Sequence, residues 1–271
     1  MTTLREVAGT SALPRLEWQM LWQNVLQVSR AWLIAHDTDP LPQDALDRYR
    51  ALEARRLAGE PMAYILGSRE FMGHDFTVTP DVLIPRPETE LLVETALDYL
   101  DGCTAPAVLD LGTGTGAIAI SIALASPSTR VVATDVSTPA LEVARANARR
   151  LGARVEFLAG SWYDALLEAT GFDLIVSNPP YIAAADDHLR QGDLRFEPAH
   201  ALTDGRDGLD AIRAIIRGAG QRLNPKGALF VEHGWDQADH VRDLMASAGF
   251  VQVESLRDLA GIERVTGGTY N

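Results

Sequence analysis

Residues 107–116 read Ala107-Val108-Leu109-Asp110-Leu111-Gly112-Thr113-Gly114-Thr115-Gly116. An apolar run with the length of a buried strand leads directly into a turn with three glycines, and a second apolar run over 117–125 follows it. Glycines at the end of a strand let the backbone approach a ligand, because no Cβ stands in the way. The stretch therefore predicts a strand, a ligand-binding turn and a helix, in preference to a tight turn without a ligand.

The alternation of strand and helix patterns continues along the chain. We expect strands at 107–111, 130–134, 155–158, 172–176, 228–232, 251–254 and 263–266, and helices at 117–125, 140–150, 209–223 and 236–246. Repeated β–α–β units with right-handed crossovers form a doubly wound sheet in which most strands are parallel. The prediction is an α/β fold with a mainly parallel, seven-stranded sheet.

The residues before this region have a different pattern. Residues 1–68 carry apolar side chains at helical spacing, which predicts a small all-helical N-terminal domain with a core that holds Trp18, Trp22 and Trp32. Residues 69–86 alternate around Gly73 as in a β-hairpin, and we expect them to form a hairpin linker. Residues 87–271 then form the α/β domain, which begins with a helix over 88–100.

A carboxylate follows the second strand of this domain. Asp135 stands at the carboxyl end of that strand, where its side chain can accept hydrogen bonds from both hydroxyls of a ribose. The glycine turn also fits the dinucleotide fingerprint loosely, with Ala117 as its third small residue. The glycine turn and Asp135 together predict an adenosine-type cofactor, without deciding which one.

The choice between cofactors comes from the fourth strand, which ends in Ser177-Asn178-Pro179-Pro180-Tyr181. Two prolines stop the strand and stiffen the turn, while the Asn178 oxygen and the Pro179 carbonyl can accept the two N–H groups of a planar amide or amine. Tyr181 offers such a group a flat face. Methylation of a planar nitrogen needs this arrangement and hydride transfer does not, so we expect S-adenosylmethionine. The proton can leave after transfer, so we expect no strong general base; a turn-forming Asn178 without a ligand is the alternative.

Composition excludes several classes of function. The 24 Lys and Arg residues against 37 Asp and Glu give a net charge of −13, which argues against tight binding to nucleic-acid phosphates. The single cysteine, Cys103, and six scattered histidines show no metal-ligand spacing. The sequence shows no signal pattern, and its longest apolar run is too short to span a bilayer. We expect a cytoplasmic protein with no metal, no membrane attachment and no direct nucleic-acid contact.

Several motifs resemble those of the HemK/PrmC family of class I S-adenosylmethionine-dependent methyltransferases. They are Gly112-Thr113-Gly114-Thr115-Gly116, Asn178-Pro179-Pro180-Tyr181, Ile84-Pro85-Arg86-Pro87-Glu88-Thr89-Glu90, Glu197-Pro198 with Ala201-Leu202, Asp204-Gly205-Arg206-Asp207-Gly208-Leu209 and Glu232-His233-Gly234. The resemblance covers nearly the whole chain. It implies methyl transfer from S-adenosylmethionine to the side-chain amide nitrogen (N5) of the glutamine in the Gly-Gly-Gln motif of class I peptide chain release factors. S-adenosylhomocysteine would be the second product.

The resemblance also implies roles for individual residues. The cofactor would be held by Gly112, Thr113, Gly114, Thr115, Gly116, Asp135, Trp162 and Asn178, with Trp162 beside the adenine. The substrate glutamine would lie against Asn178, Pro179, Pro180 and Tyr181, and catalysis would depend on Asn178, Pro179 and Tyr181. Residues 1–68 would recognise the release factor, residues 87–271 would form the methyltransferase domain, and the protein would act as a monomer.

Three alternatives remain open. A ribosomal-protein glutamine methyltransferase of the same family would share the chemistry of this site. A nucleic-acid adenine or cytosine methyltransferase would act on a similar N–H pair, but it must flip its base and hold phosphates, and the sequence has no evident basic cluster. A non-catalytic binding module is the third alternative, and the presence of both motifs argues against it.

Overall fold

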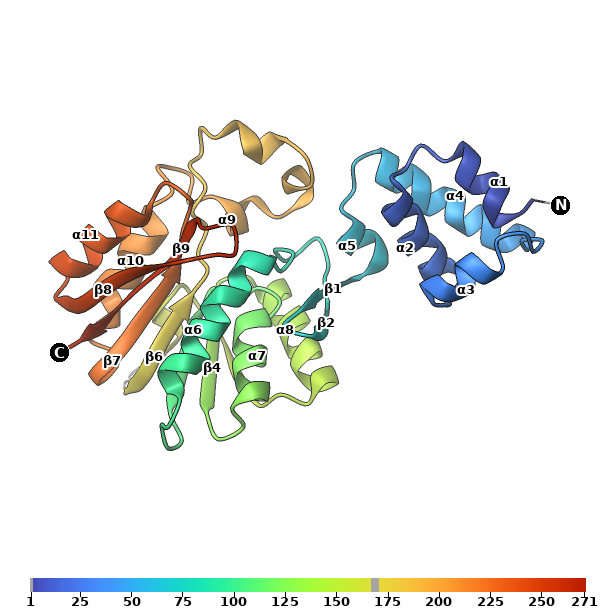
Figure 1. The fold of residues 1–271 in the computed structure, drawn as a ribbon. Coiled ribbons are helices and arrows are strands. Elements are labelled where there is room, and N and C mark those ends of the chain that lie inside the picture. Colours follow the sequence, from blue (N-terminus) through green and yellow to red (C-terminus); the bar gives the residue numbers. More distant parts are fainter. Residues whose placement is uncertain (1, 167–170) are drawn as a thin grey trace. The chain divides into compact units, whose positions relative to one another are not determined.

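The computed structural model describes residues 2–166 and 171–271. The chain divides into two compact units, Met1–Ser68 and Arg69–Asn271 (Figure 1). Each unit has a hydrophobic core of its own. The candidate site lies within the second unit, so the two units are described separately.

The first unit is helical. Its elements are α1 (Leu4–Thr10), α2 (Arg15–Leu26), α3 (Arg30–Ala35), α4 (Gln43–Leu57) and α5 (Met62–Leu66). Trp22 is fully buried and stacks on Tyr49 with ring centroids 4.4 Å apart, and Trp18 is buried beside them. The prediction that Trp32 packs in this core is wrong. Its ring stacks on His36 instead and remains 37% exposed.

A short hairpin opens the second unit, formed by β1 (Ser68–Phe71) and β2 (His74–Thr77). Phe71 and Phe76 belong to the core of the second unit. Asn147 holds the hairpin from the side, because its Oδ1 accepts from Thr77 N at 2.8 Å and its Nδ2 donates to Thr77 O at 3.0 Å. The segment expected to be a linker is thus packed onto the sheet-bearing unit.

In the described part of the chain, seven strands form the main sheet. They are β3 (Ala107–Leu111), β4 (Arg130–Asp135), β5 (Val155–Ala159), β6 (Phe172–Ser177), β7 (Leu223–Glu232), β8 (Phe250–Arg257) and β9 (Glu263–Tyr270). Their spatial order is β5-β4-β3-β6-β7-β9-β8. The pairs from β5 through β7 are parallel, and β9 is antiparallel to both of its neighbours. The predicted α/β class with a mainly parallel, seven-stranded sheet is confirmed.

Alternate residues of each central strand enter opposite cores, as a period of two requires. Val108, Val176 and Phe230 pack on one face with α6 (Glu90–Leu100), α7 (Ala117–Ala125) and α8 (Thr138–Leu151). Leu109 and Ile175 pack on the other face with α10 (Asp210–Ala219) and α11 (Ala238–Ser247). Figure 1 shows the two helical layers with the sheet between them.

The remaining short elements lie in the connections. They are η1 (Pro87–Thr89), η2 (Asp164–Leu166), η3 (Asp187–Arg190), η4 (Leu194–Phe196) and α9 (Ala199–Leu202). The expected helix over 209–223 ends earlier, at Ala219, because Leu223 already pairs with Phe172 at the start of β7. Every helix in residues 2–166 and 171–271 is too short or too polar to cross a bilayer.

The order in which successive strands are added to the sheet reverses between β3 and β6, which are parallel. From β3 the sheet grows through β4 to β5, and from β6 it grows the other way through β7. The two strands are paired so that Leu111 lies opposite Ser177. Open α/β sheets bind ligands at the carboxyl ends of the strands at such a switch point. The turns after β3 and β6 are therefore neighbours.

Candidate active site

The glycine turn after β3 is held by backbone hydrogen bonds. The N–H groups of Gly112 and Thr113 donate to Thr134 O at 2.9 and 3.0 Å, so the turn is fixed to the end of β4. Gly112, Gly114 and Gly116 have φ angles of 74°, 54° and 81°, which residues other than glycine rarely adopt. The turn needs its glycines for conformation, and α7 starts directly after it.

Asp135, at the end of β4, braces this turn. Its Oδ2 accepts from Gly114 N at 2.9 Å and its Oδ1 accepts from Ser137 N at 2.8 Å. Asp135 is half-exposed. Because a carboxylate has about four acceptor positions, two of them remain for a ligand. The next residue, Val136, leaves 66% of its surface exposed beside it.

Trp162 lies against the glycine turn. A Cβ placed on Gly112 would be 3.5 Å from Cζ3 of the Trp162 ring. Trp162 itself has φ 47°, an uncommon conformation for a side-chain-bearing residue, and its carbonyl accepts from the Thr134 hydroxyl at 3.1 Å. The ring forms a flat wall next to Gly112 and is held there by its own backbone.

The Asn178 turn follows β6. The Ser177 hydroxyl donates to Leu111 O at 2.7 Å, which ties the start of this turn to the end of β3. Asn178 Nδ2 donates to the Thr89 hydroxyl at 3.0 Å. Pro179 is buried, whereas Asn178 and Pro180 are half-buried. The turn thus presents one polar side chain beside the glycine turn.

One cavity joins these elements. It contains about 720 Å³ of empty space, part of which is open to solvent. Of the residues predicted from sequence, it brings together Gly112, Gly114, Asp135, Trp162, Asn178 and Pro180. Thr113, Thr115, Gly116, Pro179 and Tyr181 do not line it, as far as the described residues show. Its other walls are formed by Asp81, Val82, Leu83, Val136, Ala140, Gly160, Ser161, His200 and Ala201.

The predicted residues outside the lining support those within it. Thr113 donates its hydroxyl to Asp110 Oδ2 at 2.6 Å, and burial raises the pKa of Asp110 to about 7. Thr115 O accepts from Asn147 Nδ2 at 3.1 Å. A Cβ on Gly116 would lie 2.8 Å from Ile120 Cδ1 and 3.2 Å from Ala144 Cβ, so these neighbours would have to shift. These contacts fix the glycine turn from below.

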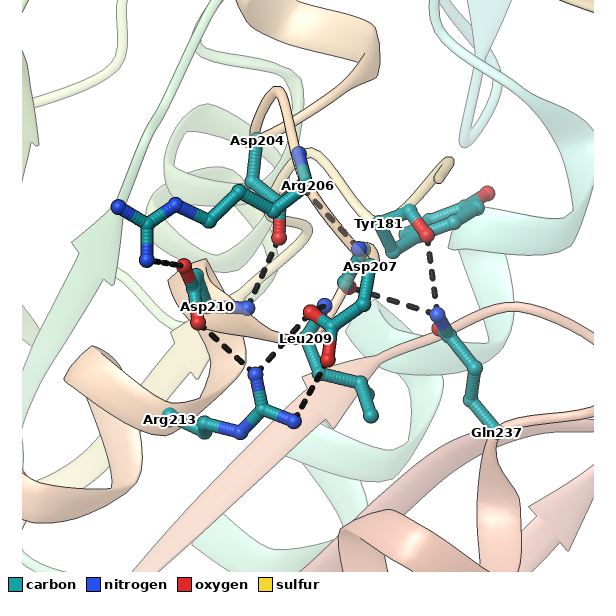
Figure 2. Close-up of polar contacts among 9 residues, drawn as sticks. Tyr181, Asp204, Arg206, Asp207, Leu209, Asp210, Arg213 and Gln237 are labelled. Atoms are coloured by element: carbon teal, nitrogen blue, oxygen red, sulfur yellow. Dashed lines mark hydrogen bonds and ion pairs between the residues drawn. The ribbon is translucent and has the colours of Figure 1, made fainter. Parts of the chain in front are cut away.

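Tyr181 is packed against the core under the sheet. Its hydroxyl lies 3.2 Å from Glu232 Oε1, and burial, with Glu232 nearby, raises its pKa well above the usual range. Its carbonyl accepts from Gln237 Nε2 at 3.0 Å (Figure 2). A Cβ on Gly208 would lie 2.2 Å from that carbonyl oxygen. The end of the Asn178 turn is thus fixed from both sides.

The loop that carries Gly208 is built on aspartates, as Figure 2 shows. Asp204 Oδ1 accepts from Arg206 N at 2.8 Å and its Oδ2 accepts from Asp210 N at 2.8 Å. Asp207 accepts from Leu209 N and pairs with Arg213 at 2.7 Å. The motif 204–209 is therefore a folded support for Tyr181.

A second brace joins two segments that line the cavity. Glu197, whose side chain is buried, accepts from Ile84 N at 2.9 Å and forms an ion pair with Arg86. Burial raises the pKa of Glu197, and Arg86 opposes that shift. The pair connects the segment at 81–83 with the segment at 200–201.

Sequence reasoning missed two groups that contact the turn at 178–181: Thr89, which contacts Asn178, and Glu232, which contacts Tyr181. Thr89 precedes α6 and Glu232 ends β7; both are buried. Burial raises the pKa of Glu232 to about 7, against the opposing effect of the nearby Thr89 and Tyr181 hydroxyls. Both residues stood in motifs quoted for the family resemblance, but nothing in their local pattern indicated that Thr89 would contact Asn178 or that Glu232 would contact Tyr181.

Family models match two parts of the chain. Residues 3–67 match the PrmC N-terminal domain, and residues 87–201 match the methyltransferase small domain. In structure, the chain is similar to a 16S rRNA methyltransferase of T. Thermophilus in complex with AdoMet and guanosine. The TM-score is 0.57 at 22% identity, over 75% of this chain and 50% of the other. At that identity the likeness supports the fold alone.

Relatives in sequence are more similar. A release factor glutamine methyltransferase of Bordetella pertussis is 62% identical over 99% of this chain and 99% of its own length. Another, of Burkholderia pseudomallei, is 55% identical over 98% of this chain and 95% of its own length. The expected resemblance to the HemK/PrmC family is confirmed. The chain belongs to the release factor glutamine methyltransferases and is an S-adenosylmethionine-dependent enzyme.

Proposed function

We propose that this protein transfers a methyl group from S-adenosylmethionine to N5 of the glutamine in the Gly-Gly-Gln motif of class I peptide chain release factors. The observation that carries the proposal is the position of Asn178. Its half-buried amide lines the same cavity as Gly112, Gly114 and Asp135. The residue that would bind a planar amide and the residues that would bind an adenosine-type cofactor thus line the same cavity.

The residues of the cavity fit the cofactor. Gly112 and Gly114 line the cavity with backbone alone, and a Cβ on Gly112 would fill the space between this backbone and the Trp162 ring. Asp135 has acceptor capacity for the ribose hydroxyls, and Trp162 and Val136 supply apolar surface for the adenine. When bound, S-adenosylmethionine supplies a methyl group on a positively charged sulfur and leaves as S-adenosylhomocysteine.

The chain's own residues position the substrate amide. Asn178 Oδ1 and the Pro179 carbonyl accept the two N–H groups of the glutamine, which fixes the plane of the amide and favours positive charge on its nitrogen. Pro180 lines the slot, and Tyr181 supports the turn through the Gly208 loop and Gln237. The amide proton passes to solvent after transfer.

The helical unit, residues 1–68, recognises the release factor in this proposal, and the sheet-bearing unit performs the transfer. The net charge of −13 suits a basic protein surface better than nucleic-acid phosphates. We propose a monomeric enzyme that acts in the cytoplasm, where translation termination takes place.

The experiment compares Asn178→Ala with wild type, using labelled methyl donor and a purified class I release factor. Ribosomal protein and duplex DNA serve as competing acceptors. We expect label on the Gly-Gly-Gln glutamine and a turnover that falls on the order of a hundredfold in the variant, because one of two positioning contacts is lost. Label on DNA or ribosomal protein instead, or near-normal turnover of the variant, would contradict the proposal.

A further inference from the structure

Asn178 is connected to a residue far from it in sequence. Its Nδ2 donates to the Thr89 hydroxyl at 3.0 Å across 89 positions of the chain. Thr89 is 4% exposed and ends the short 3-10 helix η1, directly before α6. A buried hydroxyl at a helix start is well placed to hold one orientation of the amide, because helix and strand are both rigid.

A buried carboxylate lies near the Thr89 hydroxyl. Glu232, 1% exposed at the end of β7, accepts from the Tyr181 hydroxyl through Oε1 at 3.2 Å, and the nearby Thr89 hydroxyl lowers its pKa against the larger effect of burial. The Thr89 hydroxyl meets Asn178 as an acceptor, because the NH₂ group of an amide can only donate.

The hydrogen bond to Thr89 orients the Asn178 amide. Its NH₂ group donates to the Thr89 hydroxyl, so the amide oxygen is left for the cavity that Asn178 lines. In the opposite orientation the NH₂ group of Asn178 would face the NH₂ group of a substrate glutamine. Two donors cannot bond to each other, so that orientation would not hold the substrate.

We propose that Thr89 is a positioning residue that keeps the oxygen of the Asn178 amide facing the substrate nitrogen. The inference rests on the proposed function, since it assigns a partner to the amide that grips the glutamine. Thr89 acts entirely through Asn178 and does not line the cavity in the described part of the chain. Its loss should therefore affect turnover and leave cofactor affinity unchanged.

The test replaces the hydroxyl without changing the volume. Thr89→Val removes the hydroxyl, and Thr89→Ser keeps it. We expect Thr89→Val to lower kcat about tenfold or more, with cofactor Kd by calorimetry within twofold of wild type. Thr89→Ser should restore most of the turnover. A kcat for Thr89→Val close to wild type, or an equal loss in Thr89→Ser, would overturn the proposal.

A double-mutant cycle separates positioning from a general structural effect. If Thr89 works through Asn178, Thr89→Val should have little further effect in an Asn178→Ala background. A full tenfold loss in that background would show that Thr89 acts elsewhere.

A last measurement is independent of the substrate. The side-chain NH₂ signal of Asn178, identified by its disappearance in Asn178→Ala, should exchange with solvent faster in Thr89→Val than in wild type. Unchanged exchange would refute the bond to Thr89. If wild type methylates no glutamine but this exchange effect is present, the proposed function fails and the Thr89 contact stands.

Discussion

The support under Tyr181 can be tested with two glycines of one loop. Gly205 and Gly208 both have φ 80°, so alanine at either position carries the same backbone strain. They differ in their surroundings. A Cβ on Gly205 would meet nothing within 4 Å, whereas a Cβ on Gly208 would lie 2.2 Å from the Tyr181 carbonyl oxygen. Gly205→Ala is therefore a matched control for Gly208→Ala.

The magnitudes follow from these distances. Left-handed backbone costs alanine about 1–2 kcal/mol, and the stiffer unfolded chain returns about half of that, so Gly205→Ala should lose about 1 kcal/mol. In Gly208→Ala the Tyr181 carbonyl must move until the contact of 2.2 Å becomes at least about 3.0 Å. That shift breaks the 3.0 Å bond from Gln237 Nε2. A buried carbonyl without its donor adds about 1–3 kcal/mol.

The assay is thermal unfolding of the full chain, together with methyl transfer. We expect the Tm of Gly208→Ala to lie about 4–8 °C below that of Gly205→Ala, from a difference of about 2 kcal/mol. Turnover should fall in Gly208→Ala, because a displaced Tyr181 moves the turn that carries Asn178, and should remain near wild type in Gly205→Ala. Equal Tm losses in the two variants would refute the role assigned to the Gly208 contact.

Two further predictions concern carboxylates. Asp135→Ala should weaken cofactor binding about tenfold or more, because the ribose loses its acceptor and Gly114 N loses its anchor; calorimetry that shows unchanged affinity would contradict the assignment. Glu232 is harder to ionise in the folded protein, where its pKa is about 7, than in the unfolded chain, where it is about 4.5. The stability it contributes is therefore complete below about pH 4.5 and is lost as pH rises to about 7. Over that range the loss is at most about 3 kcal/mol. Glu232→Gln should flatten this dependence in urea unfolding at pH 5 and pH 8. Parallel pH profiles of the variant and wild type would show that Glu232 titrates normally.

Much of the fold could be predicted because its elements are encoded locally. The helix expected over 117–125 is the observed α7, and each expected central strand lies in the sheet. These segments are apolar runs that are followed by glycine or by polar residues, so length and composition identify them. Where the pattern was weaker, as at 209–223, the pairing of Leu223 with Phe172 decided the boundary.

The site could be predicted where ligand contacts follow directly from strand ends. Gly112, Asp135 and Asn178 each stand at such an end and line one cavity. Thr89 and Glu232 could not be found in this way, because their roles depend on contacts between segments far apart in the chain. The structure also supplies a physical reason for motifs quoted only as family features. Arg86 and Glu197 form an ion pair, and the loop 204–209 supports Tyr181.

The register between β3 and β6 has a consequence for how the enzyme can diverge. Leu111 lies opposite Ser177, so the glycine turn and the Asn178 turn start one strand spacing apart, about 4.8 Å. That separation is a property of the backbone ladder and of the Ser177 bond to Leu111. The distance between the binding site of the methyl donor and that of the substrate amide is thus determined by the pairing of two strands in one sheet. Residues at the rim of the cavity can change and select another glutamine-bearing protein without altering the gap that the methyl group crosses.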